Sequence, residues 1–186
     1  KKDYAPELLH LPNYLTAKAE PATIRPGRVG KLVVTLKSNL LHGLGLTQSS
    51  VYLSRFAGDR VNKDNELGIS VTLLPNFTAA ELSSPQAPLA EMATDVDLGA
   101  FNGKSKLKGI VLLANKGQSP LEIKMLQVYN PGLSVSLPKT TLRPGETTEM
   151  KIVVSTAVDR FRGSRKVLLI TNDPRHPKIL VNVDRK

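Results

Sequence analysis

Cysteine and tryptophan are both absent from this sequence, and other aromatic residues are few, with four Tyr and four Phe. Without cysteine there is no disulfide, no thiolate nucleophile and no Cys-ligated zinc site. The shortage of aromatic rings removes most of the platforms on which single-stranded nucleic acids stack. These absences argue against several catalytic and nucleic-acid-binding classes before any motif is considered.

Long apolar runs are missing too. The longest uninterrupted run is Ile110–Ala114, whereas a membrane-spanning helix requires roughly 18 residues. No apolar segment follows Lys1–Tyr4, so no signal peptide is visible. The sequence therefore predicts no transmembrane segment, and its composition leaves the compartment open because cysteine-free chains occur in all of them.

The residues that are present, 40% apolar and 23% charged, are typical of a globular fold. Length alone places the 186 residues between one and two domains of roughly 150 residues. The net charge is +10, and it is uneven: residues 1–96 hold 10 basic and 9 acidic side chains (+1), whereas 97–186 hold 16 and 7 (+9). The positive charge thus belongs to the second half.

An internal repeat decides the domain count. Each half runs through a strand-like segment, an Arg-Pro-Gly turn, a second strand-like segment and a glycine. The turn recurs with an offset of 143 − 25 = 118 and the strand after it with 151 − 31 = 120. We therefore expect two related domains, separated in register by one two-residue insertion, that superpose as β-sandwiches.

The second half shows seven short runs bounded by Gly, Pro and Asn turns, which predict strands. They lie at 94–99, 107–114, 121–129, 133–137, 147–156, 164–171 and 178–184. Seven strands in about 90 residues are typical of an immunoglobulin-like sandwich. We expect an all-β protein with a partial immunoglobulin-like domain over 1–77, a linker over 78–93 and a complete domain over 94–186.

The linker contains Thr78–Glu81, a capping-box pattern, and Ser83–Gln86, a second one with a proline inside it. These patterns favour a short helix, and an ordinary polar loop is the alternative.

The first half shows only about five strands, because nothing before Leu15 matches the stretch from Asp97 to Pro120. Two opening strands would pair beside Lys31–Leu36 and cover Leu32, Val34 and Leu53. We therefore expect a bare edge and exposed apolar side chains there, filled by an upstream segment, the linker or a second copy.

The second half resembles the bacterial envelope domains of unknown function related to Hydin-type ASH modules, which are immunoglobulin-like. The resemblance is carried by Asp97–Gly99, Asn115–Leu121, Pro144–Gly145 and Thr171–Pro174, and in the first half by Arg55–Asp59 and Leu73–Phe77. Many members carry a Cys-Gly-Cys element that this sequence lacks, so a role depending on it does not transfer. The resemblance implies a periplasmic or extracellular location.

No residue pattern predicts catalysis, a metal or another cofactor. The three histidines, His10, His42 and His176, have no partner at metal-ligating spacing. We interpret His176 and Asp173 as part of an Asx-type turn rather than an acid–base pair. The glycine pairs Gly27/Gly30 and Gly43/Gly45 lack the helix of a phosphate cradle and fit turns or bulges.

Two groups of basic residues are the candidate contacts for an anion or a partner. Lys104, Lys106 and Lys108 alternate along a predicted strand and would project to one face. The other group crowds one turn and the strand after it: Arg160, Arg162, Arg165 and Lys166. The two interpretations are attraction of an acidic component and a solvated face that protects a sheet edge.

The same alternation points Ile110 and Leu112 outward if Val111 and Leu113 face the core. A neighbouring domain, the linker or a partner would cover them, unless they are simply tolerated at the surface.

These features favour a non-catalytic interaction or structural module of the bacterial cell envelope, whose partner is another protein or an acidic envelope component. Specific nucleic-acid binding is not expected, since no motif for it is visible. The alternative is a periplasmic chaperone-like protein that binds client strands. That alternative predicts two complete domains in an L shape around a basic cleft, whereas a tandem array would be extended.

Overall fold

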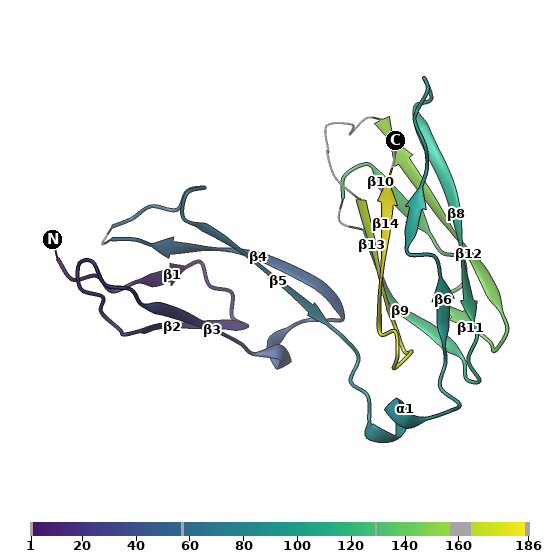
Figure 1. Ribbon diagram of the computed structural model, residues 1–186, viewed down its shortest axis with the longest axis horizontal. Coiled ribbons are helices and arrows are strands. Elements are labelled where there is room, and N and C mark those ends of the chain that lie inside the picture. Colours follow the sequence, from purple (N-terminus) through teal and green to yellow (C-terminus); the bar gives the residue numbers. More distant parts are fainter. Residues whose placement is uncertain (1, 57, 129, 157–164, 185–186) are drawn as a thin grey trace. The chain divides into compact units, whose positions relative to one another are not determined.

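The computed structural model describes residues 2–56, 58–128, 130–156 and 165–184. The chain divides into two compact units, unit 1 at Lys1–Leu73 and unit 2 at Leu74–Lys186. Both are built from β-strands (Figure 1). The expected fold class, two tandem all-β sandwich units with a short helical segment between their sheets, is confirmed.

Unit 2 is a sandwich of two sheets. One sheet has the order β10-β12-β8-β6, with β6 at Ala90–Met92, β8 at Lys106–Asn115, β10 at Leu133–Ser136 and β12 at Thr147–Ser155. The other has the order β11-β9-β13-β14-β7, with β7 at Asp95–Asp97, β9 at Leu121–Val128, β11 at Thr141–Leu142, β13 at Arg165–Thr171 and β14 at Lys178–Asp184. All seven strands expected from the sequence are present.

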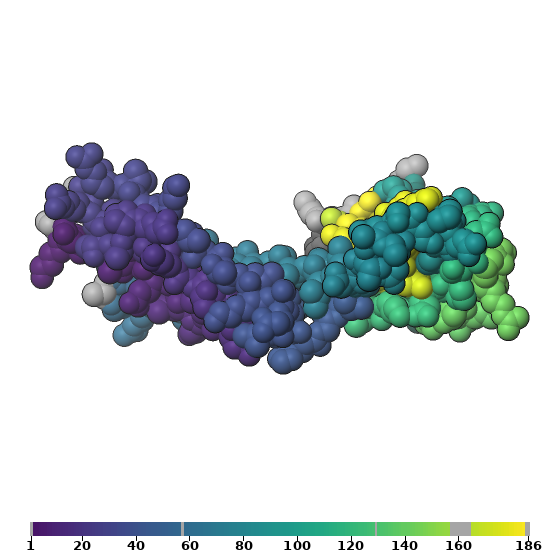
Figure 2. All heavy atoms as spheres, turned by 90° about the horizontal axis from the view of Figure 1, so that it is seen from below, coloured from purple at the N-terminus to yellow at the C-terminus, as the bar shows by residue number. Residues whose placement is uncertain are grey.

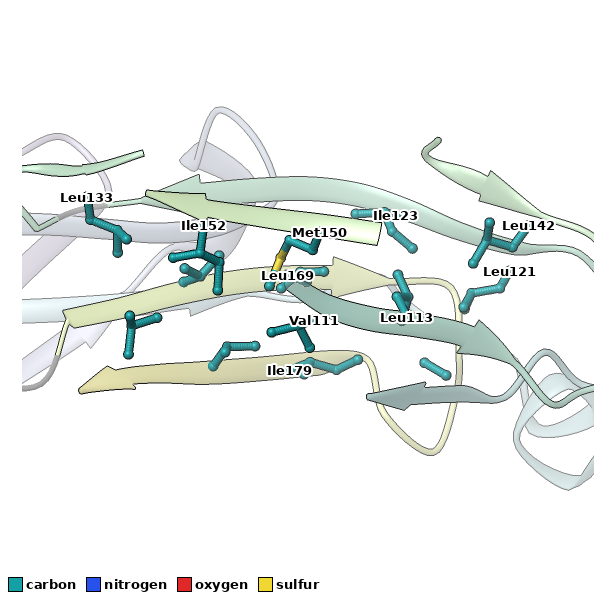
Figure 3. Close-up of a cluster of buried hydrophobic side chains, with 14 of the residues drawn as sticks. Val111, Leu113, Leu121, Ile123, Leu133, Leu142, Met150, Ile152, Leu169 and Ile179 are labelled. Atoms are coloured by element: carbon teal, nitrogen blue, oxygen red, sulfur yellow. The ribbon is translucent and has the colours of Figure 1, made fainter. Parts of the chain in front are cut away.

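Alternating side chains of the two sheets form the core of unit 2. Met150, Ile152 and Leu169 are completely buried and belong to one hydrophobic cluster with Val111 and Leu121 (Figure 3). Val111 and Leu113 face this core, as the alternation along the sequence indicated, and the same period of two in the other strands lets the two sheets pack.

The chain enters this sandwich through two very short strands that lie in different sheets. β6 pairs antiparallel with β8, and β7, two residues later, pairs parallel with β14. Figure 2 shows yellow atoms of the C-terminal strand beside teal atoms of this segment. β6 lies inside the segment 78–93 that the sequence suggested as linker, because Ala-Glu-Met contains none of the β-branched or aromatic residues that indicate a strand.

The helix before β6 is α1, at Ala79–Ser83. Thr78 caps it in the expected capping box: Glu81 N–H donates to Thr78 Oγ1, and Thr78 N–H donates to Glu81 Oε2. The second capping pattern forms no helix. Ser84 Oγ accepts a hydrogen bond from Gln86 N–H in a turn instead, so the loop alternative holds there.

The turn after β8 is tied to the start of the domain by buried polar groups. Asn115 is fully buried, and its side-chain amide donates to the carbonyls of Ser119 and Leu142 while its oxygen accepts from Gly117 N–H. A Cβ on Gly117 would lie 2.4 Å from Ala87 O and from Leu89 N. This close backbone approach explains why glycine occupies position 117.

Over its described residues, unit 1 has five strands in two sheets. β1 (Glu7–Leu9), β4 (Gly45–Ser54) and β5 (Glu66–Leu73) form the order β1-β4-β5, and β2 (Leu15–Glu20) pairs antiparallel with β3 (Lys31–Leu36). A short 3-10 helix, η1, spans Ser38–Leu40. Unit 1 has few buried apolar side chains among its described residues: Leu8, Tyr14, Leu15 and Val51.

Strand register corrects one detail of the repeat. Leu15 pairs with Leu36, and Leu133 pairs with Val154, which gives 133 − 15 = 118 and 154 − 36 = 118. The Arg-Pro-Gly turn has the same offset, so the two-residue insertion expected from the sequence does not exist. Alternation concealed this, because a shift of two residues leaves every side chain on the same face.

Candidate interaction surface

The outer face of unit 2 collects the lysines of β8. Lys106 and Lys108 are exposed on this strand, and Leu107 between them is buried. Lys104 lies in the turn before it, where its N–H donates to Phe101 O at 2.8 Å. The predicted alternation is therefore confirmed for Lys106 and Lys108, and Lys104 sits just outside the strand.

Ile110 and Leu112 continue the same outward row, as expected, and are 57% and 59% exposed. On the neighbouring strand β12, Lys151 stands opposite Ile110, Glu149 opposite Leu112 and Val153 opposite Lys108. We name this surface the β8–β12 face, with residues Lys106, Lys108, Ile110, Leu112, Glu149, Lys151 and Val153. It combines three cations, one carboxylate and three aliphatic side chains.

A groove runs beside the β8–β12 face, because β6 pairs only with Leu113–Asn115 and leaves the rest of that edge of β8 without a strand among the described residues. Its volume is about 650 Å³. The lining combines apolar side chains with carboxylates on the β6–β7 side, among them Met92, Val96, Glu91, Asp95 and Asp97.

The two described members of the second predicted group, Arg165 and Lys166, lie on β13, in the other sheet from the lysines of β8. Arg165 is only 2% exposed and belongs to the inward-facing set of β13, so its expected place in an exposed patch is corrected. Lys166 is half-buried on the same strand, in the other sheet from Lys106, and its N–H donates to Asn130 Oδ1 at 2.6 Å. Arg160 and Arg162 lie outside the described residues.

The Asp173–His176 segment is an Asx-type turn, as interpreted from the sequence. Asp173 is fully buried, and its Oδ1 accepts from Arg175 N–H at 2.8 Å. Its Oδ2 accepts from Ala90 N–H at 2.9 Å and lies 3.0 Å from His176 Nδ1. The carboxylate thus anchors β6 to the β13–β14 turn, which is a structural duty.

A pocket of about 440 Å³ lies at the α1 end of unit 2, and sequence analysis did not point to it. Phe77, Pro88 and Pro174 supply apolar walls, and Glu81 and Lys124 supply charges. Its residues come from four separate segments, so no local pattern could have revealed it.

A large pKa shift occurs in unit 1, at the Asp59 carboxyl group, away from the β8–β12 face and from the pocket near α1. Arg55 donates through Nε and Nη2 to the Asp59 carboxylate, at 2.8 and 3.2 Å, and through its backbone N–H at 2.9 Å. These hydrogen bonds lower the pKa of Asp59 from 3.8 to about 2, the side-chain bonds most of all. The pair holds the loop after β4 together.

The described residues contain no cluster of three or more His, Cys, Asp or Glu side chains that could hold a metal ion. Gly27, Gly43 and Gly45 have positive φ angles, which fits the turn interpretation of the glycine pairs. In the described part of the chain, no helix has the length and apolar character needed to cross a membrane.

Two sheets packed around one core, antiparallel except for the parallel β7–β14 pair, define unit 2 as an immunoglobulin-like domain. The family model for the HYDIN/CFA65/VesB-like Ig-like domain matches residues 88–184, more than half of the chain. The chain therefore belongs to this family, and the resemblance to Hydin-type modules is confirmed. A search of curated proteins finds no significant match.

Solved structures with the same fold include a protein of unknown function from Porphyromonas gingivalis W83. It is 21% identical, with a TM-score of 0.66, and the match covers 100% of this chain and 86% of that one. The VesB protease of Vibrio cholerae is 12% identical with a TM-score of 0.44, over 75% of this chain and 49% of the protease. The secreted serine protease VesC from the same species matches at 9% identity and a TM-score of 0.35, over 65% of this chain and 27% of VesC.

Proposed function

We propose that this chain is a non-catalytic interaction module of the bacterial cell envelope and that it binds a protein partner through the β8–β12 face. The observation that carries the proposal is the pair of exposed aliphatic side chains, Ile110 and Leu112, set in one row with Lys106 and Lys108. Adjacent apolar side chains with a charged rim are typical of protein-binding patches.

The chemistry of the face specifies the partner. Three lysines outnumber the one carboxylate, Glu149, so a partner with carboxylates around an apolar centre would be complementary. A purely polysaccharide partner would leave Ile110 and Leu112 without apolar contact. Location in the periplasm or outside the cell is part of the proposal and is supported by the family resemblance.

Site-specific photocrosslinking in cells that express the natural gene tests this proposal. A photoreactive amino acid at position 112 should give a discrete protein adduct in the envelope fraction, and one at Thr141, on the opposite sheet, should not. The Lys108→Glu substitution should reduce the adduct. Absence of an adduct at both 110 and 112, or a cytoplasmic location of the protein, would contradict the proposal.

A chaperone-like function that binds client strands is the second candidate, and the observation that favours it is the edge of β3. This strand pairs with β2 on one side, and no strand among the described residues pairs with its other side. A free edge of this kind is the usual acceptor for an added strand.

A further inference from the structure

Unit 1 and unit 2 contain the same hairpin, and this repeat shows what the edge of β3 is built to hold. β2 and β3 correspond to β10 and β12 at the offset of 118. Lys37 N–H donates to Tyr14 O at 2.8 Å, and Ser155 N–H donates to Gly132 O at 2.9 Å, which is the same hydrogen bond in each unit. Residues of β3 can therefore be compared one by one with those of β12.

In unit 2 the far side of β12 is paired along its whole length with β8, from Thr147 opposite Ala114 to Ser155 opposite Lys106. The inward residues Ile152 and Val154 are consequently 0% and 1% exposed. Their counterparts in β3, Val34 and Leu36, are 40% and 41% exposed. The difference between the units is the strand that β8 supplies in one of them.

The free edge of β3 presents a defined set of backbone groups. Lys37 N–H points toward β2, and N–H groups alternate in direction along a strand. The N–H groups of Leu36, Val34 and Leu32 therefore point to the free edge. Of these residues, Val34 and Leu36 carry exposed inward side chains and Leu32 is half-buried, so backbone pairing and apolar burial would be gained together.

We propose that this edge accepts one extended polypeptide segment, antiparallel to β3, with the inward pattern of β8 and acidic residues near its ends. The inference deepens the second candidate function by naming the partner's chemistry. The register of β8 on β12 gives the pattern of this segment. On β8, Val111, Gly109 and Leu107 stand opposite the β12 counterparts of Leu32, Val34 and Leu36. The segment should therefore have an apolar residue opposite Leu32, a small residue opposite Val34 and an apolar residue opposite Leu36.

The acidic residues of the proposed segment are inferred from the positions at which β3 has a lysine and β12 does not. Lys31 and Lys37 stand where unit 2 has Glu149 and Ser155, whose partners on β8 are Leu112 and Lys106. A lysine at the Lys106 position would face Lys37 directly, and like charges in opposed positions destabilise a strand pair. Carboxylates at these two positions would instead face lysines.

Like-charge contacts also disfavour a second copy of β3 as the occupant. The antiparallel pairing that engages all three outward N–H groups, those of Leu32, Val34 and Leu36, sets Val34 against Val34 of the copy. This pairing places Lys31 against Lys37 at both ends. Two like-charge contacts would oppose such a dimer.

Peptide binding to the 186-residue chain tests the proposal. The probe is a fluorescent peptide with the sequence of residues 106–115 and Glu at the positions of Lys106 and Leu112. We expect saturable binding of one peptide per chain, about tenfold tighter than a peptide that keeps Lys106, and slower amide exchange at Leu32, Val34 and Leu36. A peptide of the same composition in scrambled order is the control.

Two variants locate the site. Val34→Pro removes an N–H from the free edge, where proline is tolerated, and should abolish binding, whereas Val34→Ala keeps that N–H and should bind. Should Val34→Pro fail to fold, Lys31→Glu with Lys37→Glu provides the second test, because it should reverse the preference toward the lysine peptide. Binding that none of these substitutions changes, no saturable binding at all, or a chain dimer that Val34→Pro dissolves would overturn the inference. Photocrosslinking at position 112 tests the β8–β12 face separately, so failure of one proposal leaves the other standing.

Discussion

A few individual residues of unit 2 lie in environments that no other side chain fits. The Asn115 side chain bonds backbone groups of three segments, at Leu89, at Gly117–Ser119 and at Leu142, and Gly117 makes room for the chain at residues 87–89. Buried polar groups that lose such a partner keep the full cost of desolvation. These two positions should therefore be more sensitive than their turn location suggests.

Gly117→Ala should lower the free energy of unfolding of unit 2 by about 2–3 kcal/mol, since its Cβ would meet backbone atoms that cannot rotate away. Chemical denaturation measures this change, and Gly103→Ala is informative beside it, because that glycine has open space and only a positive φ of 80°. Equal effects of the two substitutions would contradict the close approach at Gly117.

The pH dependence of unit 1 follows from Asp59. Its pKa is lowered in the folded chain, so its stabilising effect is complete above the unfolded value near 3.8 and is lost as pH falls through about 2. Asp59→Asn should remove this dependence between pH 4 and 2. An NMR titration of the Asp59 carboxyl should show a midpoint near 2 in the native chain and near 4 in Arg55→Ala; a native midpoint near 4 would refute the assignment.

Among the strands, β8 has one buried face and one exposed face. Its inward residues hold the core and its outward residues are exposed. The row Lys106, Lys108, Ile110 and Leu112 is therefore available for binding without cost to the fold.

Substitution of Ile110 and Leu112 by Ser should change the unfolding free energy by no more than about 0.5 kcal/mol each, as for other surface positions. Ile152→Ala in the core should cost about 2–5 kcal/mol. Thermal denaturation of the variants distinguishes these outcomes. A large loss in the Ser variants would mean that the β8–β12 face is covered within the chain.

For the molecule as a whole, the net positive charge is concentrated in one half of the chain: residues 1–96 carry +1 and residues 97–186 carry +9. Binding of the chain to heparin, used as a polyanion probe, should weaken steeply as salt rises, because surface charges are screened over about 10 Å at 0.1 M. The triple variant with Lys106→Glu, Lys108→Glu and Lys151→Glu should elute from a heparin column at a lower salt concentration than the unsubstituted chain. The control is Lys18→Glu in unit 1, which should have a smaller effect; equal effects would reject the β8–β12 face as the basic surface.

Sequence patterns revealed the longer strands of unit 2 almost residue by residue, because these strands alternate over four or more residues between Gly, Pro and Asn turns. They missed β6 and β11, which have three and two residues and are held by contacts far along the chain. Arg165 was misplaced for a different reason: charge predicts exposure, but the neighbouring strands β9 and β14 decide which residues of β13 are buried. The β8–β12 face was visible in the alternation, whereas the groove and the α1 pocket arise only when distant segments meet.

The two units share one hairpin and differ in whether a further strand pairs with its second strand. Residue-resolved amide hydrogen exchange of the 186-residue chain measures this directly. Protection to the level of global unfolding of unit 2 is expected for the amides of Met150, Ile152 and Val154. Exchange should be orders of magnitude faster at their counterparts in β3, which are Leu32, Val34 and Leu36. Within β3, the amides of Val33 and Thr35 should exchange more slowly than their neighbours, because their N–H groups face β2. Equal protection of the two sets would contradict the account.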